Sequence, residues 1–217
     1  MCKTIYIVGG GPSLYGYDWN LLKEKNIIGI NRAFEVVPWA DFIYFTDYKF
    51  FIEYQHKGLL DVDSILATVD DRIRHTNVMN FINSGVNGID TSKDCLRVGK
   101  NSGHAAINLA VHLGAKRIVL LGFDMCTEQC SVTRIRDKKS MMVSGRSHWH
   151  EGYKTGPNLG TYPTMLRHFP SLVDPLKELG IEVLNASPRS KLEIFPKISL
   201  GDAHLVDKHT VECIPRN

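Results

Sequence analysis

The chain has 217 residues, of which 43% are hydrophobic and 23% are charged. These values are typical of an ordinary soluble domain with enough apolar residues for one α/β core. The formal net charge of +3 does not demand a nucleic-acid or membrane partner, and no apolar run has the length of a membrane span. Five scattered cysteines favour a reducing, cytoplasmic location over a disulfide framework.

The first ordered segment is predicted to be a buried strand that ends in a glycine turn. Residues 5–8 are apolar or aromatic in succession, as in a strand covered on both faces. Gly9, Gly10 and Gly11 follow, and Pro12 suits the first turn of a helix. Glycines permit positive φ and close approach of a ligand, and free N–H groups at such a turn attract phosphate. The turn is therefore a candidate nucleotide site, with a plain strand-to-helix connection as the structural alternative.

Apolar periodicity predicts alternating strands and helices along the rest of the chain. The expected helices span residues 14–25, 48–56, 101–114 and 163–179, the last kinked or split by Pro170 and Pro175. The expected strands span residues 26–30, 41–47, 64–69, 77–82, 117–124 and 181–185, and residues 83–99 are expected to form a loop. This alternation predicts a Rossmann-like α/β fold, a parallel sheet with helices on both faces. We expect one domain over residues 1–200 with an inserted lid at 125–160, and a C-terminal tail at 201–217.

Polar residues fall where the predicted strands end, which is where open parallel sheets bind ligands. Ser13, Asn31, Asp47 and Asp124 complete the predicted nucleotide site with the three turn glycines. Asn31 stands where NAD-binding proteins carry an acid, so NAD is disfavoured. Asp124 is expected to orient a hydroxyl, to hold Mg²⁺ through water or to anchor a loop.

The predicted helix at 101–114 offers a second group of N–H donors. Asn101 or Ser102 is expected to cap this helix, and Gly114 to end it. Ser102 and Gly103 at its start are candidates to bind a phosphate or a sugar carboxylate, with capping as the structural alternative.

The predicted lid contains the strongest candidates for acid–base chemistry. His148 and His150 are alternate residues, so both rings point the same way in an extended segment. Together with Cys126 and Cys130 they also have the ligand types of a zinc site, although the spacing is not specific.

Basic residues also gather in the predicted lid, and they include Arg134, Arg136 and Arg146. Such a run is either a solvated loop or a surface for an anionic acceptor, such as a phosphorylated lipid-linked sugar or DNA.

Several motifs, taken in order, resemble those of the bacterial lipooligosaccharide sialyltransferases. They are the segments 8–14, 31–34, 102–103, 110–124, 147–150 and 183–192. The resemblance implies a Rossmann-like fold with a lid after the strand that ends at Asp124. It also implies a CMP-sugar donor, an inverting displacement, a histidine base and no metal.

Carried over residue by residue, the resemblance implies that the glycine turn, Ser13 and Asn31 hold the nucleotide. Ser102 and Gly103 would face the donor sugar. His150 is the first choice of base and His148 the second.

Two other functions remain open at this point. The glycine turn and the segment ending at Asp124 also resemble the archaeal-type 6-hydroxymethylpterin diphosphokinases, which move a diphosphate from ATP with Mg²⁺. The acids Asp47 and Asp124 favour this alternative. A non-catalytic nucleotide- or zinc-binding module is the third hypothesis. The leading hypothesis is a cytoplasmic glycosyltransferase whose partner is a nucleotide-sugar donor, and we also consider a homo-oligomer.

Overall fold

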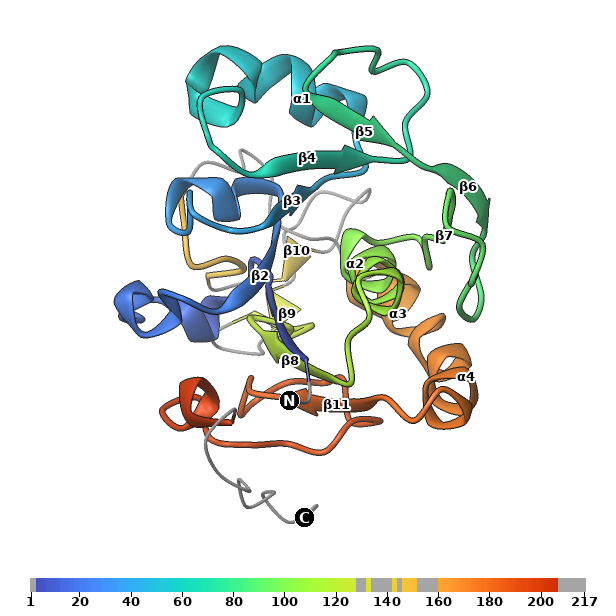
Figure 1. The fold of residues 1–217 in the computed structure, drawn as a ribbon. Coiled ribbons are helices and arrows are strands. Elements are labelled where there is room, and N and C mark those ends of the chain that lie inside the picture. The colour runs from blue at the N-terminus through green and yellow to red at the C-terminus, as the bar shows by residue number, and fades with distance from the viewer. Residues whose placement is uncertain (1–2, 128–131, 134–141, 144–145, 152–159, 207–217) are drawn as a thin grey trace.

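A seven-stranded sheet, parallel throughout, forms the centre of the molecule (Figure 1). The computed structural model describes residues 3–127, 132–133, 142–143, 146–151 and 160–206. In spatial order, the strands are β11 (Glu182–Asn185), β8 (Arg117–Leu121), β1 (Thr4–Val8), β2 (Asn26–Ile30), β3 (Phe42–Tyr44), β4 (Ile65–Thr68) and β5 (Val78–Asn80). The predicted Rossmann-like α/β class is confirmed.

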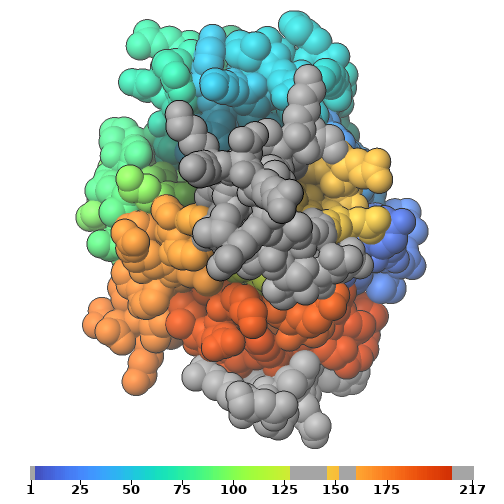
Figure 2. All heavy atoms as spheres, turned by 180° about the vertical axis from the view of Figure 1, so that it is seen from behind, coloured from blue at the N-terminus to red at the C-terminus, as the bar shows by residue number. Residues whose placement is uncertain are grey.

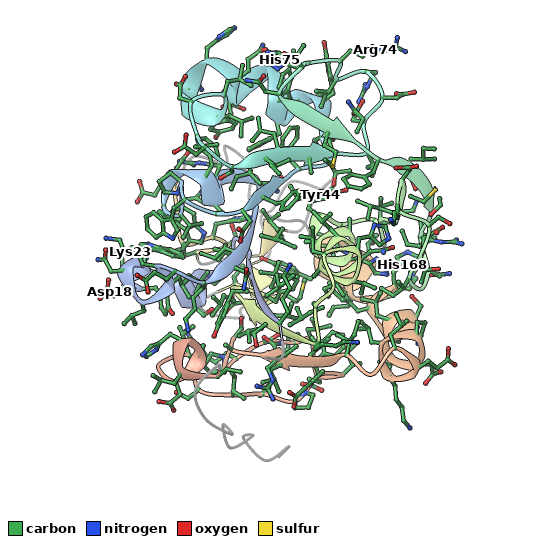
Figure 3. The ribbon with its side chains drawn as sticks, in the orientation of Figure 1. Asp18, Lys23, Tyr44, Arg74, His75 and His168 are labelled. Carbon is green, nitrogen blue, oxygen red and sulfur yellow. The ribbon has the colours of Figure 1, made fainter. Side chains whose placement is uncertain are left out.

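Side chains alternate between the two faces of the sheet and build two hydrophobic cores. Ile5 and Ile7 of β1 belong to one core, and Tyr6 and Val8 belong to the other. Tyr44 lies among the interior side chains, whereas the charged Asp18 and Lys23 lie at the edge of the molecule (Figure 3). The first core is covered by α2 (Ser102–His112), η5 (Phe169–Leu172) and α4 (Val173–Glu178). The second is covered by η1 (Pro12–Leu14), η2 (Trp19–Leu22), η3 (Asn31–Glu35) and α1 (Tyr48–Tyr54), which continues into η4 (Gln55–Leu59).

The predicted helix after Lys100 is confirmed as α2. The side chain of Asn101 caps it by accepting a hydrogen bond from the His104 backbone N–H at 2.8 Å. Ser102 lies next to the end of β3, because its hydroxyl is 3.0 Å from that of Thr46. The N-terminus of α2 is therefore held at the carboxyl edge of the sheet.

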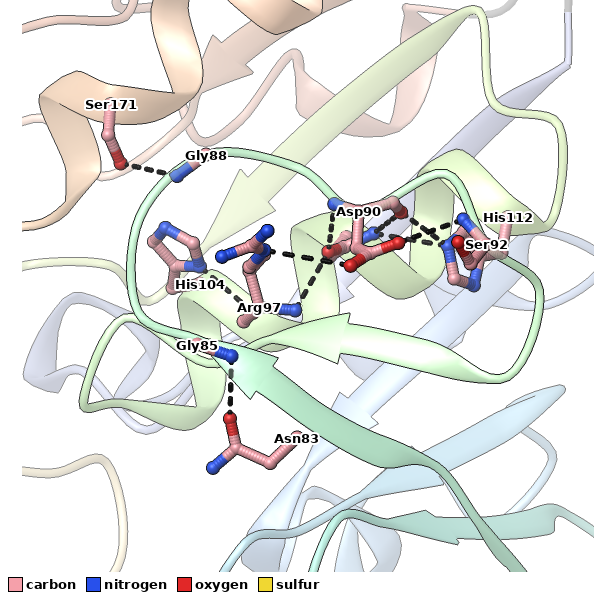
Figure 4. Close-up of polar contacts among 10 residues, drawn as sticks. Asn83, Gly85, Gly88, Asp90, Ser92, Arg97, His104, His112 and Ser171 are labelled. Atoms are coloured by element: carbon pink, nitrogen blue, oxygen red, sulfur yellow. Dashed lines mark hydrogen bonds and ion pairs between the residues drawn. The ribbon is translucent and has the colours of Figure 1, made fainter.

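The expectation of a loop at residues 83–99 is wrong. This stretch contains the end of β6 (Ile82–Gly85) and all of β7 (Cys95–Arg97), which form a separate parallel pair. The buried Asn108 of α2 holds the pair in place through the backbone of Asp90 and Arg97, two residues that Figure 4 labels. Its Oδ1 accepts hydrogen bonds from the backbone N–H groups of Asp90 and Arg97, both at 2.9 Å, and its Nδ2 donates to the Asp90 carbonyl at 2.8 Å. Sequence periodicity missed these strands because they are short and mostly polar.

Two helix predictions have different outcomes. A helix over residues 14–25 is wrong, since Gly16 adopts φ +73° and Asp18 starts a separate short turn by accepting from the Asn20 N–H at 3.0 Å. The predicted split of residues 163–179 is confirmed. The chain forms α3 (Thr161–Leu166), then η5 with Pro170, then α4 with Pro175.

The segment after β11 packs back against the sheet. Asn185 forms a parallel bridge with Lys197, and η6 (Ala203–Leu205) follows. Ala203 and Val206 are buried in the second core, so the chain contributes to that core beyond residue 200. Within the predicted lid, the structure describes a short antiparallel pair of β9 (Val132–Thr133) and β10 (Met142–Val143). Among the described residues, no helix has the length and apolar content that crossing a bilayer requires.

Candidate functional site

A cavity of about 700 Å³ lies at the carboxyl ends of the central strands. The turns after β1, β2, β3 and β8 contribute to it, together with the start of α2 and part of α3. Of the residues that the sequence predicted for the nucleotide and donor sugar, those lining the cavity are Gly9, Gly10, Gly11, Asn31, Asp47, Ser102, Gly103 and Asp124. They meet because parallel strands present their carboxyl ends at one edge of a sheet.

The glycine turn is engaged by the protein itself, contrary to the expectation of free N–H groups. The N–H of Gly9 donates to the Leu121 carbonyl and that of Gly11 to the Gly122 carbonyl, both at 2.8 Å. A methyl group on Gly11 would lie 1.8 Å from Asp124 Oδ2. Gly11 itself has φ −63°. The turn therefore needs glycine because the end of β8 crosses it closely, and the N–H groups of Gly9 and Gly11 are already used by this crossing.

Asp124 is tied to the turn by Ser13. The Ser13 hydroxyl donates to Asp124 Oδ2 at 2.8 Å, and its backbone N–H donates to Oδ1 at 3.3 Å. Burial raises the pKa of the Asp124 carboxyl, and the hydrogen bonds from Ser13 act in the opposite direction. Among the two, only Asp124 lines the cavity, and Ser13 contacts the site through its hydrogen bonds to Asp124. Of the three roles expected for Asp124, these bonds favour the anchoring of a loop.

Three non-glycine residues with left-handed backbone lie along the same cavity. Asn31, Lys100 and Met125 have φ of +52°, +56° and +52°. Such conformations cost free energy and gather at functional sites. Asn31 also carries a buried Oδ1 for which the described part of the chain offers no hydrogen-bond partner. An unsatisfied buried acceptor at a cavity wall is a place where a ligand donor fits.

The start of α2 contributes to the wall of the cavity. Ser102, Gly103 and the preceding Lys100 all line it. Gly103 allows close packing, because a methyl group there would lie 2.6 Å from Cε1 of Phe123. The helix dipole, its first N–H groups and the lysine all favour negative charge at this point.

The histidine segment is fastened to the glycine turn by Trp149, a residue to which the sequence analysis gave no role. Its backbone N–H donates to the Gly10 carbonyl at 3.0 Å, and its indole N–H donates to the Gly9 carbonyl at 3.1 Å. The indole also packs edge-on against Trp19, with ring centroids 5.6 Å apart. Residues 146–151 accordingly lie beside the N-terminal segment at the surface (Figure 2).

His148 and His150 stack on each other, with ring centroids 5.1 Å apart. His148 lines the cavity, and its Nδ1 lies 2.8 Å from the Ser147 hydroxyl. His150 lies beside it, where its Nδ1 accepts a hydrogen bond from Arg32 at 3.0 Å. Arg32 also donates to the Glu151 carbonyl and holds Glu35 through two hydrogen bonds of 2.7 Å.

Both imidazoles are neutral at physiological pH. Burial lowers the pKa of His148 from 6.5 to about 4, and the neighbouring His150 and Arg32 act in the same direction. Burial, followed by the charge of Arg32, likewise lowers the pKa of His150 to about 4. Each ring can therefore accept a proton without first losing one.

The remaining candidates lie elsewhere. The Arg146 guanidinium stacks over the exposed Tyr15, 3.6 Å from the ring centroid, and does not line the cavity. Arg134, Arg136 and Cys130 lie outside the described residues. Cys126 is buried and lines the cavity, and the described residues contain no group of three or more side chains suited to a metal ion.

Sequence reasoning also missed Thr161 and Tyr162, which reach the cavity from the start of α3. Nothing in the local pattern indicated that this helix would return to the site.

No protein-family model matches the chain, and no curated protein matches it significantly. Among solved structures, the chain is similar to the MAf glycosyltransferase from Magnetospirillum magneticum AMB-1, with a TM-score of 0.62 and 16% sequence identity. The fold of this chain is therefore similar to that of a glycosyltransferase. The match covers 99% of this chain and 35% of the MAf chain, so this chain spans about a third of that protein's length. The predicted likeness to glycosyltransferases is thus confirmed at the level of the fold.

A second similar structure is the sialyltransferase CstII from Campylobacter jejuni in complex with the substrate analogue CMP-3FNeuAc. The TM-score is 0.47 and the identity 16%, over 99% of this chain and 91% of that one.

Proposed function

We propose that the chain is a glycosyltransferase that moves a sugar from a nucleotide-activated donor to a hydroxyl acceptor. One observation carries the proposal: a single cavity joins an anion site at α2, the unsatisfied Oδ1 of Asn31 and the neutral ring of His148. The fold likeness to a glycosyltransferase supports the same reaction class by analogy. The choice of a CMP-sugar rests on the sequence resemblance to the sialyltransferases.

The donor phosphate belongs at Lys100 and the start of α2. The negative charge of the departing nucleotide is stabilised there by the N–H groups of Ser102 and Gly103, by the helix dipole and by the ammonium group of Lys100. Asn31 Oδ1 accepts a hydrogen bond from a ribose hydroxyl or a base amino group. In this proposal the chain's own groups stabilise the leaving group, and no metal ion takes part.

His148 is the proposed base. With Nδ1 beside Ser147, its Nε2 takes the proton of the acceptor hydroxyl. The acceptor oxygen then forms a bond to the anomeric carbon, and the bond from that carbon to the phosphate oxygen breaks with inversion. The electron pair leaves with the nucleotide. Burial lowers the pKa of His148 to about 4, and a donor phosphate bound beside the ring would raise that pKa and make the ring a better proton acceptor. This order differs from the sequence-based preference for His150, because His148 is the ring at the cavity wall.

A thermal-shift panel tests the ligand class. CMP, UDP, ATP and NAD are each added with and without Mg²⁺, and a ligand at a hundred times its Kd adds about 2.7 kcal/mol of stability. Stabilisation by CMP without metal supports the proposal. Stabilisation by ATP only with Mg²⁺ would overturn it in favour of diphosphate transfer, and zinc in the purified protein that Cys126→Ser removes would favour a metal-braced module.

The base is tested by single-turnover transfer from CMP-sialic acid. His148→Ala is expected to lose about 10²–10⁴-fold in kcat with CMP affinity kept, the range for removal of a general base. His150→Ala, the matched neighbour, is expected to lose less. Full activity in both single variants and in the double variant would refute a histidine base.

A further inference from the structure

Arg32 of η3 joins the centre of the fold to the segment that carries the two histidines. Its side chain is 17% exposed, and Glu35 holds one edge of the guanidinium, because Nε donates to Oε1 and Nη2 to Oε2, both at 2.7 Å. From the other edge, Nη1 donates to Nδ1 of His150 at 3.0 Å and to the Glu151 carbonyl. Resting on the proposed function for its catalytic meaning, we infer that Arg32 is a positioning residue. It fixes the tautomer of His150 with the proton on Nε2, and it thereby leaves His148 as the only base of the stacked pair.

The position of the donor group is set by η3. A guanidinium held by two parallel hydrogen bonds to one carboxylate cannot turn without breaking both, and Arg32 and Glu35 form such a pair. The guanidinium also lies over the ring of Tyr54, 5.6 Å from the ring centroid. Nη1 carries two hydrogens, and the histidine segment offers it two acceptors. Arg32 is therefore a fixed donor to which the His150 ring is adapted.

The chemistry of this donor decides the tautomer of His150. A guanidinium has N–H donors only and keeps its charge at every physiological pH, so Nδ1 must accept with its lone pair. In the neutral ring the proton then lies on Nε2. The Glu151 carbonyl lies 3.4 Å from the same Nδ1 and would suit a proton there. Arg32 prevails because its N–H is closer and because the same Nη1 also donates to that carbonyl.

The two rings of the stacked pair consequently differ as bases. To take up a proton, His150 would have to give up its bond from Arg32 and place a second positive charge beside the guanidinium. Burial, followed by the charge of Arg32, lowers the pKa of His150 to about 4. Nδ1 of His148 lies 2.8 Å from the Ser147 hydroxyl, which can accept as well as donate. With Ser147 accepting, His148 keeps its proton on Nδ1 and a lone pair on Nε2, the nitrogen that the proposed reaction uses.

NMR of the ¹⁵N-labelled protein without ligand tests the tautomer, because protonated and unprotonated ring nitrogens give separate resonances. His148→Gln and His150→Gln assign the signals, and we expect the proton of His150 on Nε2. Arg32→Met keeps the length of the side chain but removes its charge and donors. We expect this variant to populate the form with the proton on Nδ1 and to raise the pKa of His150 from about 4. Arg32→Lys, which keeps a charge and a donor, is expected to retain the wild-type tautomer.

Arg117→Met is the matched control. Arg117 also donates to a carboxylate and a backbone carbonyl, those of Glu182 and Val206, but it lies at the amino end of β8, away from the cavity. We expect it to change neither the tautomer nor the activity. In single-turnover transfer from CMP-sialic acid, Arg32→Met is expected to lower kcat roughly 10- to 100-fold, the scale for a misplaced catalytic group, while the CMP thermal shift stays unchanged. Arg32→Lys is expected to restore most of that loss.

Three spectra would overturn the inference. They are a proton on Nδ1 of His150 in the wild-type protein, an unchanged tautomer in Arg32→Met, and the same change in Arg32→Lys as in Arg32→Met, which would assign the effect to lost packing. A changed tautomer with full transfer activity would overturn the catalytic meaning of Arg32. If the wild-type protein neither binds CMP nor uses CMP-sialic acid, the proposed function itself has failed. The spectra, recorded without ligand, still decide the tautomer, so the two failures are distinguished.

Discussion

Two neighbouring glycines provide the sharpest test of the site geometry, because a methyl group on each meets a different part of the molecule. On Gly11 it would lie 1.8 Å from Asp124 Oδ2 and 2.5 Å from the Gly122 carbonyl oxygen. On Gly10 it would meet Cδ2 of His148 at 2.8 Å. We therefore expect Gly11→Ala to damage the fold and Gly10→Ala to damage the chemistry.

The cost of Gly11→Ala follows from what must move. The crossing strand end is backbone, so overpacking costs about 1–3 kcal/mol. Displacing Asp124 also breaks its hydrogen bonds from Ser13 and leaves a buried acceptor unsatisfied, at about 1–3 kcal/mol. The sum of about 2–6 kcal/mol corresponds to a fall in Tm of about 4–24 °C for a chain of this size.

Gly10→Ala has a smaller effect on stability and a larger one on activity. The imidazole of His148 lies on a surface segment and can shift, so we expect a loss of less than about 1 kcal/mol. A displacement of the proposed base by a fraction of an ångström lowers kcat roughly 10- to 100-fold. Urea unfolding, a CMP thermal shift and single-turnover transfer measure the three quantities. Equal stability of the two variants, or full activity in Gly10→Ala, would refute this reading of the turn.

Three further predictions concern the positioning of His148, the pH dependence of stability and the support of β6 and β7 by α2. Trp149→Phe keeps an aromatic ring but removes the hydrogen bond from the indole N–H to the Gly9 carbonyl. We expect kcat to fall while the affinity for CMP is kept, and we expect the pKa of His148, measured by NMR, to rise from about 4. An unchanged pKa would contradict the anchoring role of Trp149. Burial lowers the pKa of His104 from 6.5 to about 4, so the unfolded chain binds its proton first, and stability is expected to fall as the pH drops through this window. The resulting loss of unfolding free energy is at most about 3 kcal/mol. If urea titrations give the same unfolding free energy from pH 6.5 to pH 4, this effect of His104 is excluded. Asn108→Ala is expected to cost about 2–4 kcal/mol, because the Asp90 and Arg97 N–H groups lose their acceptor, and hydrogen exchange in β6 and β7 is expected to rise with it.

The sequence by itself determined the frame of this protein. Uninterrupted apolar runs marked β1, β2 and β8 as buried strands, and Asn101 marked the start of α2. These are local properties, because burial on both faces and capping are encoded within a few residues. The polar residues that end the strands could then be assigned to one edge, since parallel topology brings them together without further information.

Only the tertiary structure decided what each of these residues touches. The glycine turn read as a phosphate loop, but the end of β8, over 100 positions away in the sequence, takes up the N–H groups of Gly9 and Gly11. Alternation predicted that His148 and His150 share a side, and the stacked rings agree, yet the position of the cavity decided which ring faces it. A neighbouring cavity of about 450 Å³ had no sequence signal, because it arises from the approach of Asn31, α1 and Arg72. Periodicity specifies which side of an element is covered, whereas the partner that covers it is set by packing between distant segments.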